Sequence, residues 1–136
     1  MGLTASHTRA HLVRAILEGV AYSLKDTFTI FREIGVPVER IRLGGGGARS
    51  AVWRQIQADV YAHEIEIVEA EEGAAYGAAI LAGVGAKCWG SVDQATDAVV
   101  RVAKKVSVDK ANSAQMQNGY RVFKRIYPGL RAMLGS

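Results

Sequence analysis

The sequence predicts a helix-rich α/β fold with a small sheet. Short segments of alternating polar and apolar residues stand between segments whose apolar residues recur at helical spacing, which is the pattern of strands between helices. A run of four glycines joins the first of these strands to the helix after it. With 136 residues, of which 49% are hydrophobic, the chain is long enough for one domain with its own core.

The first element is expected to be a helix over residues 8–34, about 40 Å long at about 1.5 Å per residue. Gly35 and Pro37 end it, because glycine accepts a left-handed cap and proline cannot continue a helix. The apolar stripe of this helix consists of Val13, Leu17, Val20, Leu24, Phe28 and Phe31.

Two strands and a helix are expected next. Residues 40–43 alternate and predict a strand that runs into the glycines, and residues 64–68 alternate again and predict a second strand. Between them, Ser50 is placed to cap a helix. The predicted buried side chains of this helix are Val52, Trp53, Ile56 and Val60. Trp53 has a second interpretation, as a stacking partner for an adenine ring, although a core role is the commoner one.

Residues 73–83 are mostly glycine and alanine. They predict a helix whose backbone lies close to a sheet or to another helix, since each interior glycine otherwise costs about 1 kcal/mol. Ser91, with Gln94 three residues later, predicts the start of a short helix that ends near Val100.

The remaining residues predict a strand and a helix. Residues 104–109 are expected to form a short edge strand, and a last helix begins near Asn112 until Pro128 bends or ends it. Its apolar stripe is Met116, Tyr120, Phe123 and Tyr127. A sheet of two or three strands seldom stands alone, and the first helix follows no strand. We therefore expect the domain to be incomplete, with further strands in sequence outside these residues.

Composition excludes several classes of function. The net charge of +4 is scattered along the chain and forms no dense basic stripe, so a nucleic-acid partner is not expected. No apolar run approaches the roughly 20 residues of a membrane helix, and the first residues lack a signal-peptide pattern, so neither a membrane nor export is expected. Cys88 is the only cysteine, which favours a reducing cytoplasm.

The histidines raise the question of a metal. His7 and His11 are four residues apart, which is the spacing of two ligands on one helical face. A zinc site needs more ligands, and none follows nearby. His11 is therefore expected to be a packing or hydrogen-bonding residue, and no residue is assigned to a metal.

The glycine run carries the main chemical signal. A strand that leads through glycines into a helix exposes backbone N–H groups, and the helix N-terminus favours phosphate. This pattern predicts a nucleotide-binding loop, here called the glycine loop, made of Gly44, Gly45, Gly46, Gly47, Ala48, Arg49 and Ser50. The alternative is a tight turn that needs a positive φ. One or two glycines are enough for a turn, whereas four remove side chains along a whole surface, so binding is favoured.

Two common phosphate motifs are excluded. The P-loop requires a Gly-Lys pair, which the chain lacks, and the dinucleotide fingerprint requires glycine or alanine where Arg49 or Ser50 stands. The glycine loop therefore belongs to a different kind of phosphate-binding motif.

Three segments resemble one enzyme family. LGGGGARS at residues 43–50, followed by WRQI and ADV, is similar to the adenosine segment of the FGGY carbohydrate kinases. HLVRAILEG at residues 11–19 resembles the end of that family's second signature, and EGAAYGAA at residues 72–79 resembles the helix after its adenosine strand. The three blocks stand in the family's order and span residues 8–85. Their amino-acid sequences are most similar to those of xylulokinases.

The resemblance implies a fold and an activity. Residues 1–136 are expected to be a piece of the C-terminal nucleotide-binding domain of a two-domain sugar kinase, which is an actin-like (ribonuclease H-like) second domain. The expected reaction uses ATP and Mg²⁺ to convert D-xylulose to xylulose 5-phosphate, while ribulose, gluconate and glycerol stay open as acceptors. By position, Gly45, Gly46 and Gly47 approach the α-phosphate and ribose, and Arg49 and Ser50 lie near the adenine. The alternative for Arg49 is a solvated charge of the loop.

The departures from the family are equally informative. Its phosphate-binding Asp-x-Gly loop and its Gly-Asp-Gln segment with the catalytic base are absent, so the partner expected for this chain is a missing N-terminal domain, and a homodimer is compatible with the resemblance. Asp59 is expected to be a cap or a surface contact, and no catalytic residue is assigned. The chain alone is expected to be inactive. The alternative is a non-catalytic interaction module that has kept the fold.

Overall fold

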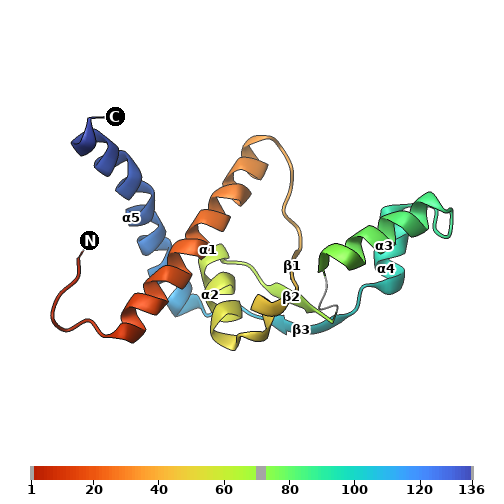
Figure 1. The fold of residues 1–136 in the computed structure, drawn as a ribbon, viewed down its shortest axis with the longest axis horizontal. Coiled ribbons are helices and arrows are strands. Elements are labelled where there is room, and N and C mark those ends of the chain that lie inside the picture. The colour runs from red at the N-terminus through yellow and green to blue at the C-terminus, as the bar shows by residue number, and fades with distance from the viewer. Residues whose placement is uncertain (1, 70–72, 136) are drawn as a thin grey trace.

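The computed structural model describes residues 2–69 and 73–135 (Figure 1). The helices and strands are, in chain order, α1 (Arg9–Glu33), β1 (Ile41–Leu43), the 3₁₀ helix η1 (Gly46–Arg49), α2 (Ala51–Tyr61), β2 (Ile65–Val68), α3 (Gly73–Gly85), α4 (Val92–Val99), β3 (Val102–Val106) and α5 (Lys110–Leu134). The predicted helix-rich α/β class with a small sheet is confirmed.

The sheet has the order β1-β2-β3. β1 runs parallel to β2, with Ile41 opposite Ile65, and β3 runs antiparallel to β2, with Val106 opposite Ile65. The expected edge strand is therefore confirmed, although it begins earlier than predicted and ends at Val106. It ends there because Asp109 already caps α5, accepting hydrogen bonds from the amides of Ala111 and Asn112.

α2 lies at the centre of the molecule and joins two apolar clusters. One cluster combines α2 with α1 and α5 and contains Ala21, Tyr22, Ile56, Val60, Met116 and Tyr120. The other places α2 against the sheet and contains Ala48, Ala58, Ile65, Ile67 and Val106. Because helices cover one side of α2 and the sheet covers the other, every residue from 56 to 60 is buried. The central position of α2 fixes the glycine loop at its N-terminus.

The predicted buried face of α2 is only partly correct. Ile56 and Val60 are buried and Trp53 packs against the helical cluster, which confirms its core interpretation. Val52 is 55% exposed, so its predicted burial is wrong. The reason is that the neighbouring helices and the sheet bury the later turns of α2, whereas Val52 lies in the first turn.

Asp59 is the clearest correction to the sequence prediction. It is 1% exposed rather than a surface contact, and it lies inside α2 rather than at a cap. Its Oδ1 accepts hydrogen bonds from Gln55 Nε2 and from the backbone N–H of Asp109, both at 2.8 Å. A buried carboxylate is stable only when such donors satisfy it. Asp59 therefore fixes the start of α5 against α2.

α5 differs from its prediction beyond the middle. Met116 and Tyr120 are buried as expected, but Tyr127 is 71% exposed. Pro128 does not end the helix, which continues to Leu134 and is followed by Gly135 at φ 70°. In Figure 1 the C-terminal half of α5 diverges from α1, so its side chains find no partner helix there.

α1 and α5 pack closely where they cross. Tyr22 of α1 lies against Tyr120 and Phe123, with ring centroids 5.9 and 5.5 Å away, and its hydroxyl donates to Met116 Sδ at 3.4 Å. A methyl group at Gly119 would collide with the Tyr22 hydroxyl and would lie 3.2 Å from Cζ of that ring. Gly119 is therefore required by packing.

A pair of glycine substitutions in α5 tests this packing. Gly119→Ala is expected to destabilise the fold by up to about 2 kcal/mol, because overpacking costs about 1–3 kcal/mol and alanine regains about 1 kcal/mol in a helix. Gly129→Ala is the matched control, since a methyl group there would meet nothing within 4 Å, and it is expected to leave stability unchanged or raised. Urea unfolding of both variants measures the difference. Equal shifts in the same direction would contradict the packing role.

α3 and α4 form a hairpin at the other end of the sheet from α5 (Figure 1). The close approach predicted for the glycines of α3 is to a sheet or another helix, whereas at Gly83 a methyl group would lie 2.9 Å from Cε3 of Trp89, which stands between α3 and α4. At Gly73 and Gly77 it would meet nothing within 4 Å, so the prediction is wrong for these two positions. Glu72, from the third family-like block, lies outside the described residues.

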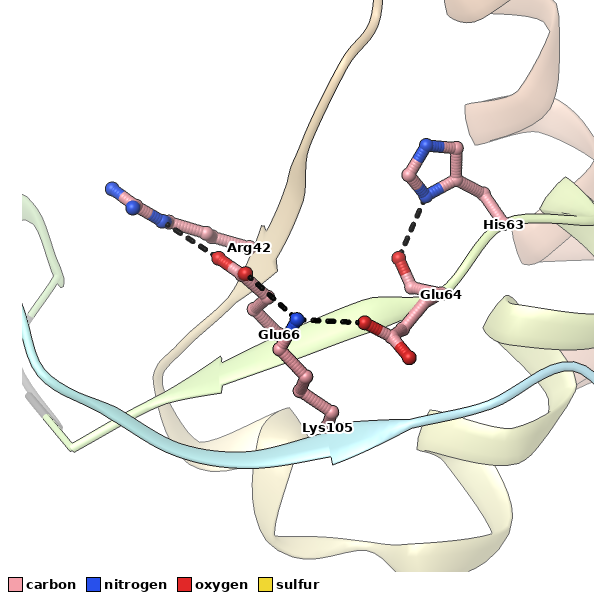
Figure 2. Close-up of polar contacts among 5 residues, drawn as sticks. All are labelled: Arg42, His63, Glu64, Glu66 and Lys105. Carbon is pink, nitrogen blue, oxygen red and sulfur yellow. Dashed lines mark hydrogen bonds and ion pairs between the residues drawn. The ribbon is translucent and has the colours of Figure 1, made fainter.

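The exposed face of the sheet carries a ladder of charges across all three strands, which Figure 2 shows. Arg42 Nε lies 3.2 Å from Glu66 Oε2, and Lys105 Nζ lies 2.9 Å from Glu64 Oε1 and 3.6 Å from Glu66 Oε1. His63 Nδ1 donates to the Glu64 carbonyl at 2.7 Å. The hydrogen bond from Arg42 holds the pKa of Glu66 below its usual value. Such cross-strand pairs favour the observed register.

Within the described ranges, none of the helices combines the length and the apolar character that crossing a bilayer would require.

Candidate functional site

The glycine loop connects the end of β1 to the start of α2. β1 and β2 are parallel, so their carboxyl ends, at Leu43 and Val68, lie at the same edge of the sheet. In α/β sheets, ligands bind at this edge, outside the carboxyl ends of the strands. The fold therefore puts the loop where a ligand is expected.

The backbone of the loop separates the turn interpretation from the binding interpretation. Only Gly45 has a positive φ, 74° with ψ −175°, a conformation that is almost restricted to glycine. Residues Gly46–Arg49 follow as η1, where the Ala48 amide donates to Gly45 O at 3.0 Å and the amide of the cap Ser50 donates to Gly47 O at 3.3 Å. The turn thus explains a glycine at position 45 and no other.

Neither the backbone conformation nor the packing explains why position 46 is a glycine. Its φ is not positive, and a methyl group there would meet nothing within 4 Å. A methyl group at Gly47 would lie 3.4 Å from Trp53 Nε1, in ordinary contact with that side chain. A bare backbone at Gly46 faces open space, which is the arrangement that a closely approaching ligand needs.

The N-terminus of α2 supplies donors beside the loop. Ser50 caps the helix as predicted, and its Oγ accepts from the Trp53 amide at 3.3 Å. Within the described residues, the turn uses the amides of Ala48 and Ser50 and does not use those of Gly46 and Gly47. These two N–H groups and the positive end of the helix dipole suit an anion.

Arg54 supports the loop in a way that sequence reasoning missed. Its Nη1 donates to the Ala48 carbonyl at 2.9 Å and so ties the loop to the first turn of α2. The signal in the sequence was its position four residues after the cap Ser50, one helical turn along the face that carries the loop. Arg54 is a positioning residue for the glycine loop.

A cavity of about 350 Å³ opens beside the loop. Its lining comes from both the loop and the ends of β2 and β3 and consists of Gly45, Ala48, Arg49, Arg54, Ile67, Val68, Glu69 and Ala103. The charged side chains in the described part of this lining are Arg49, Arg54 and Glu69. Loop, helix terminus and cavity together fit the phosphate end of a nucleotide.

The other chemical candidates have structural roles. His7 Nδ1 accepts from the Thr4 amide at 3.0 Å, and His11 Nδ1 accepts from the Thr8 amide at 3.1 Å, at the start of α1. The hydrogen-bonding role predicted for His11 is therefore confirmed. In the described part of the chain, no three residues of the types His, Cys, Asp and Glu are grouped as metal ligands would be.

Comparison with known proteins agrees with these features. Residues 1–86 match the model of the C-terminal domain of the FGGY family of carbohydrate kinases. Xylulose kinase from Staphylococcus epidermidis is 35% identical over 93% of this chain, and gluconokinase from Bacillus licheniformis is 47% identical over 59% of it. The chain covers 26% and 16% of these two relatives, respectively.

Solved structures of FGGY kinases share the fold. The xylulose kinase of Rhodospirillum rubrum superposes with a TM-score of 0.85 at 34% identity, over 100% of this chain and 28% of that one. A glycerol kinase of Plasmodium falciparum with ADP gives a TM-score of 0.69 at 27% identity, over 92% of this chain and 26% of that one. The fold is that of the actin-like ATPases. The chain belongs to the FGGY family of carbohydrate kinases and corresponds to part of their C-terminal domain.

Proposed function

We propose that this chain is the ATP-binding part of a kinase that transfers the γ-phosphoryl group of ATP to D-xylulose and forms xylulose 5-phosphate. The observation that carries the proposal is the bare backbone at Gly46, which neither the turn nor the packing of the protein requires. The family and the similarity to xylulose kinases support the same conclusion.

In this proposal the glycine loop holds the nucleotide. The amides of Gly46 and Gly47 donate to the α-phosphate, Gly45 lies beside the ribose, and Arg49 and Ser50 lie on the adenine side. The glycerol kinase structure that resembles this chain is described as holding ADP, which supports a nucleotide role for the shared fold. Arg54 keeps the loop in place through its bond to Ala48.

The chemistry is divided between this chain and the remainder of a longer kinase. Mg²⁺-bound ATP supplies the phosphoryl group, and catalysis of phosphoryl transfer consists mainly of positioning and charge stabilisation. This chain contributes nucleotide contacts, and we assign the proton acceptor and the sugar contacts to the rest of the polypeptide. The chain's share of its relatives' length, about a quarter, supports this division.

Surface features also support a larger protein. Large apolar side chains stay exposed on the first half of α1 and the last turns of α5, including Ile16, Leu130 and Met133. The Nε2 atom of buried Gln57 has no hydrogen-bond partner among the described residues, and Gln57 lines a cavity of about 460 Å³ between α1 and β1. An unpaired buried donor costs about 1–3 kcal/mol. We propose that further polypeptide covers these places.

Gluconate is the second candidate acceptor. The gluconokinase of Bacillus licheniformis has the higher identity, 47%, but over 59% of this chain, whereas the xylulose kinase of Staphylococcus epidermidis matches over 93%. The longer match favours xylulose.

A panel of acceptors tests the sugar. The full-length kinase that contains this chain is assayed for ADP release with D-xylulose, D-ribulose, gluconate and glycerol. D-xylulose is expected to give a kcat/KM at least about tenfold above the others, which corresponds to about 1.4 kcal/mol of discrimination in the transition state. A higher kcat/KM for gluconate would replace xylulose by the second candidate, and no turnover with any acceptor would favour a non-catalytic module.

A further inference from the structure

A second cavity lies at the opposite end of α2 from the glycine loop. It has a volume of about 590 Å³ and is lined by the second half of α1, by the turn after α2 and by the middle of α5. This volume is typical of small-molecule sites. The 11 residues of α2 separate the two cavities by about 16 Å. The proposed kinase activity does not use this cavity.

The charged side chains that line this cavity, among the described residues, are all basic. Lys25 and Arg32 come from α1 and Arg121 comes from α5, and none of the described side chains that line the cavity is acidic. Asp26, which follows Lys25 in the sequence, is engaged by the Tyr120 hydroxyl. The three cations therefore converge on one concave surface without a carboxylate in its lining.

Lys25 is fixed at the cavity by contacts with the end of α2 and the middle of α5. Its ammonium group donates to the Val60 carbonyl at 2.8 Å and to Gln117 Oε1, and it lies 4.7 Å from the centre of the Tyr120 ring. An ammonium group has three donors, so one is left for a ligand. Burial lowers the pKa of Lys25, and the nearby charges of Arg32 and Lys124 lower it further. Two further basic side chains, Arg32 and Lys124, therefore lie near this ammonium group.

Aromatic rings form the apolar part of the lining. Phe28 packs edge-to-face on Tyr61, with ring centroids 4.9 Å apart, and Tyr120 completes the wall. Burial raises the pKa of Tyr61 to about 12, so this side chain brings no negative charge at neutral pH. The lining combines a charged end with flat apolar surfaces.

We propose that this cavity is a second ligand site, which binds a small molecule carrying a phosphate group, with Arg32, Arg121 and Lys25 as the phosphate contacts. Phosphate is favoured over carboxylate because the dianion matches several cations, whereas guanidinium groups bind the oxygens of either group in pairs. The aromatic wall holds the carbon skeleton of the molecule. The inference is independent of the proposed kinase activity.

Calorimetric titration with inorganic pyrophosphate at low ionic strength tests this site. Arg32→Gln and Arg121→Gln are each expected to weaken binding at least about tenfold, since each removes one charge-assisted contact. Arg125→Gln is the matched control, because it removes an exposed cation of α5 that does not line the cavity, and it is expected to change the affinity less than about twofold.

A variant of the glycine loop distinguishes the two sites. Gly46→Val is expected to leave pyrophosphate binding at the second cavity unchanged. The proposal is supported if Gly46→Val retains pyrophosphate binding and Arg32→Gln loses it. The proposal is overturned if pyrophosphate does not bind, if Gly46→Val rather than Arg32→Gln removes the binding, or if Arg125→Gln weakens it as much as Arg121→Gln does. The last result would mean a diffuse attraction to surface charge.

Discussion

The 136-residue chain alone is expected to release ADP with D-xylulose at least about a thousand times more slowly than the full-length kinase. Phosphoryl transfer requires a positioned hydroxyl, a carboxylate that takes its proton and a metal ion on the phosphates. The γ-phosphate end of ATP would remain in water, because no second domain closes over it. Each missing charge-assisted contact forfeits about 1.5–3 kcal/mol. A coupled assay of both proteins at equal concentration measures the ratio.

Three of the aspartates in this chain have structural roles. Asp26 accepts from the Tyr120 hydroxyl, buried Asp59 accepts two hydrogen bonds, and Asp109 caps α5. Each of these three carboxylates is engaged by groups of this chain, and we assign no catalytic base to them. Turnover by the isolated chain near the rate of the full-length protein would contradict this account and would make Asp26 and Asp59 candidates for the catalytic base.

Gly46→Val in the full-length kinase is expected to weaken ATP binding about a hundredfold, which is about 2.7 kcal/mol. The branched side chain would occupy the open space that we assign to the phosphate and ribose. Because Gly46 lacks both a positive φ and internal neighbours within 4 Å, the fold itself should tolerate the change. The affinity for D-xylulose and the melting temperature are therefore expected to stay close to those of the unmodified protein. Calorimetry with ATP and with D-xylulose gives both affinities.

Gly46→Ala provides a graded control for this prediction. The single methyl group fills less of the open space, so its effect on ATP affinity is expected to lie between the unmodified protein and Gly46→Val. Gly45→Val is a poorer test, because valine at φ 74° would strain the backbone whether or not a ligand binds. Unchanged ATP affinity in Gly46→Val would remove the binding interpretation of the loop.

Local signals in the sequence were sufficient for most elements of the fold. Ser50 and Ser91 cap the helices that they predicted, because a cap depends on a side chain and an amide only three residues away. The alternating residues 64–68 form β2 for a similarly local reason. The position of the glycine loop between a strand and a helix followed from these elements.

Features that depend on distant contacts could not be predicted. The burial of Asp59 is stabilised by Asp109, which is 50 residues away, so the sequence around Asp59 contains no sign of it. Tyr127 continues the apolar stripe of α5, but its exposure depends on the divergence of α1. Pro128 lies inside the helix despite its local tendency to end one.

The geometry of the candidate site could also be predicted only in part. The sequence pattern identified the glycine loop as a whole and left two interpretations open, whereas the structure assigns the positive φ to Gly45 and leaves Gly46 open. Arg54 was part of the family-like block, yet its bond to Ala48 depends on the angle between the loop and α2. Sequence periodicity contains no information about that angle.

Photolabelling with 8-azido-ATP tests the central claim, that the glycine loop binds the nucleotide of a sugar kinase. The full-length kinase is irradiated with the probe, digested with trypsin and mapped by mass spectrometry. The label is expected on the peptides of residues 43–49 and 50–54, which lie on the proposed adenine side, and excess ATP is expected to remove it. The assignment of the nucleotide to this loop would be contradicted if the label that excess ATP displaces mapped only outside these two peptides.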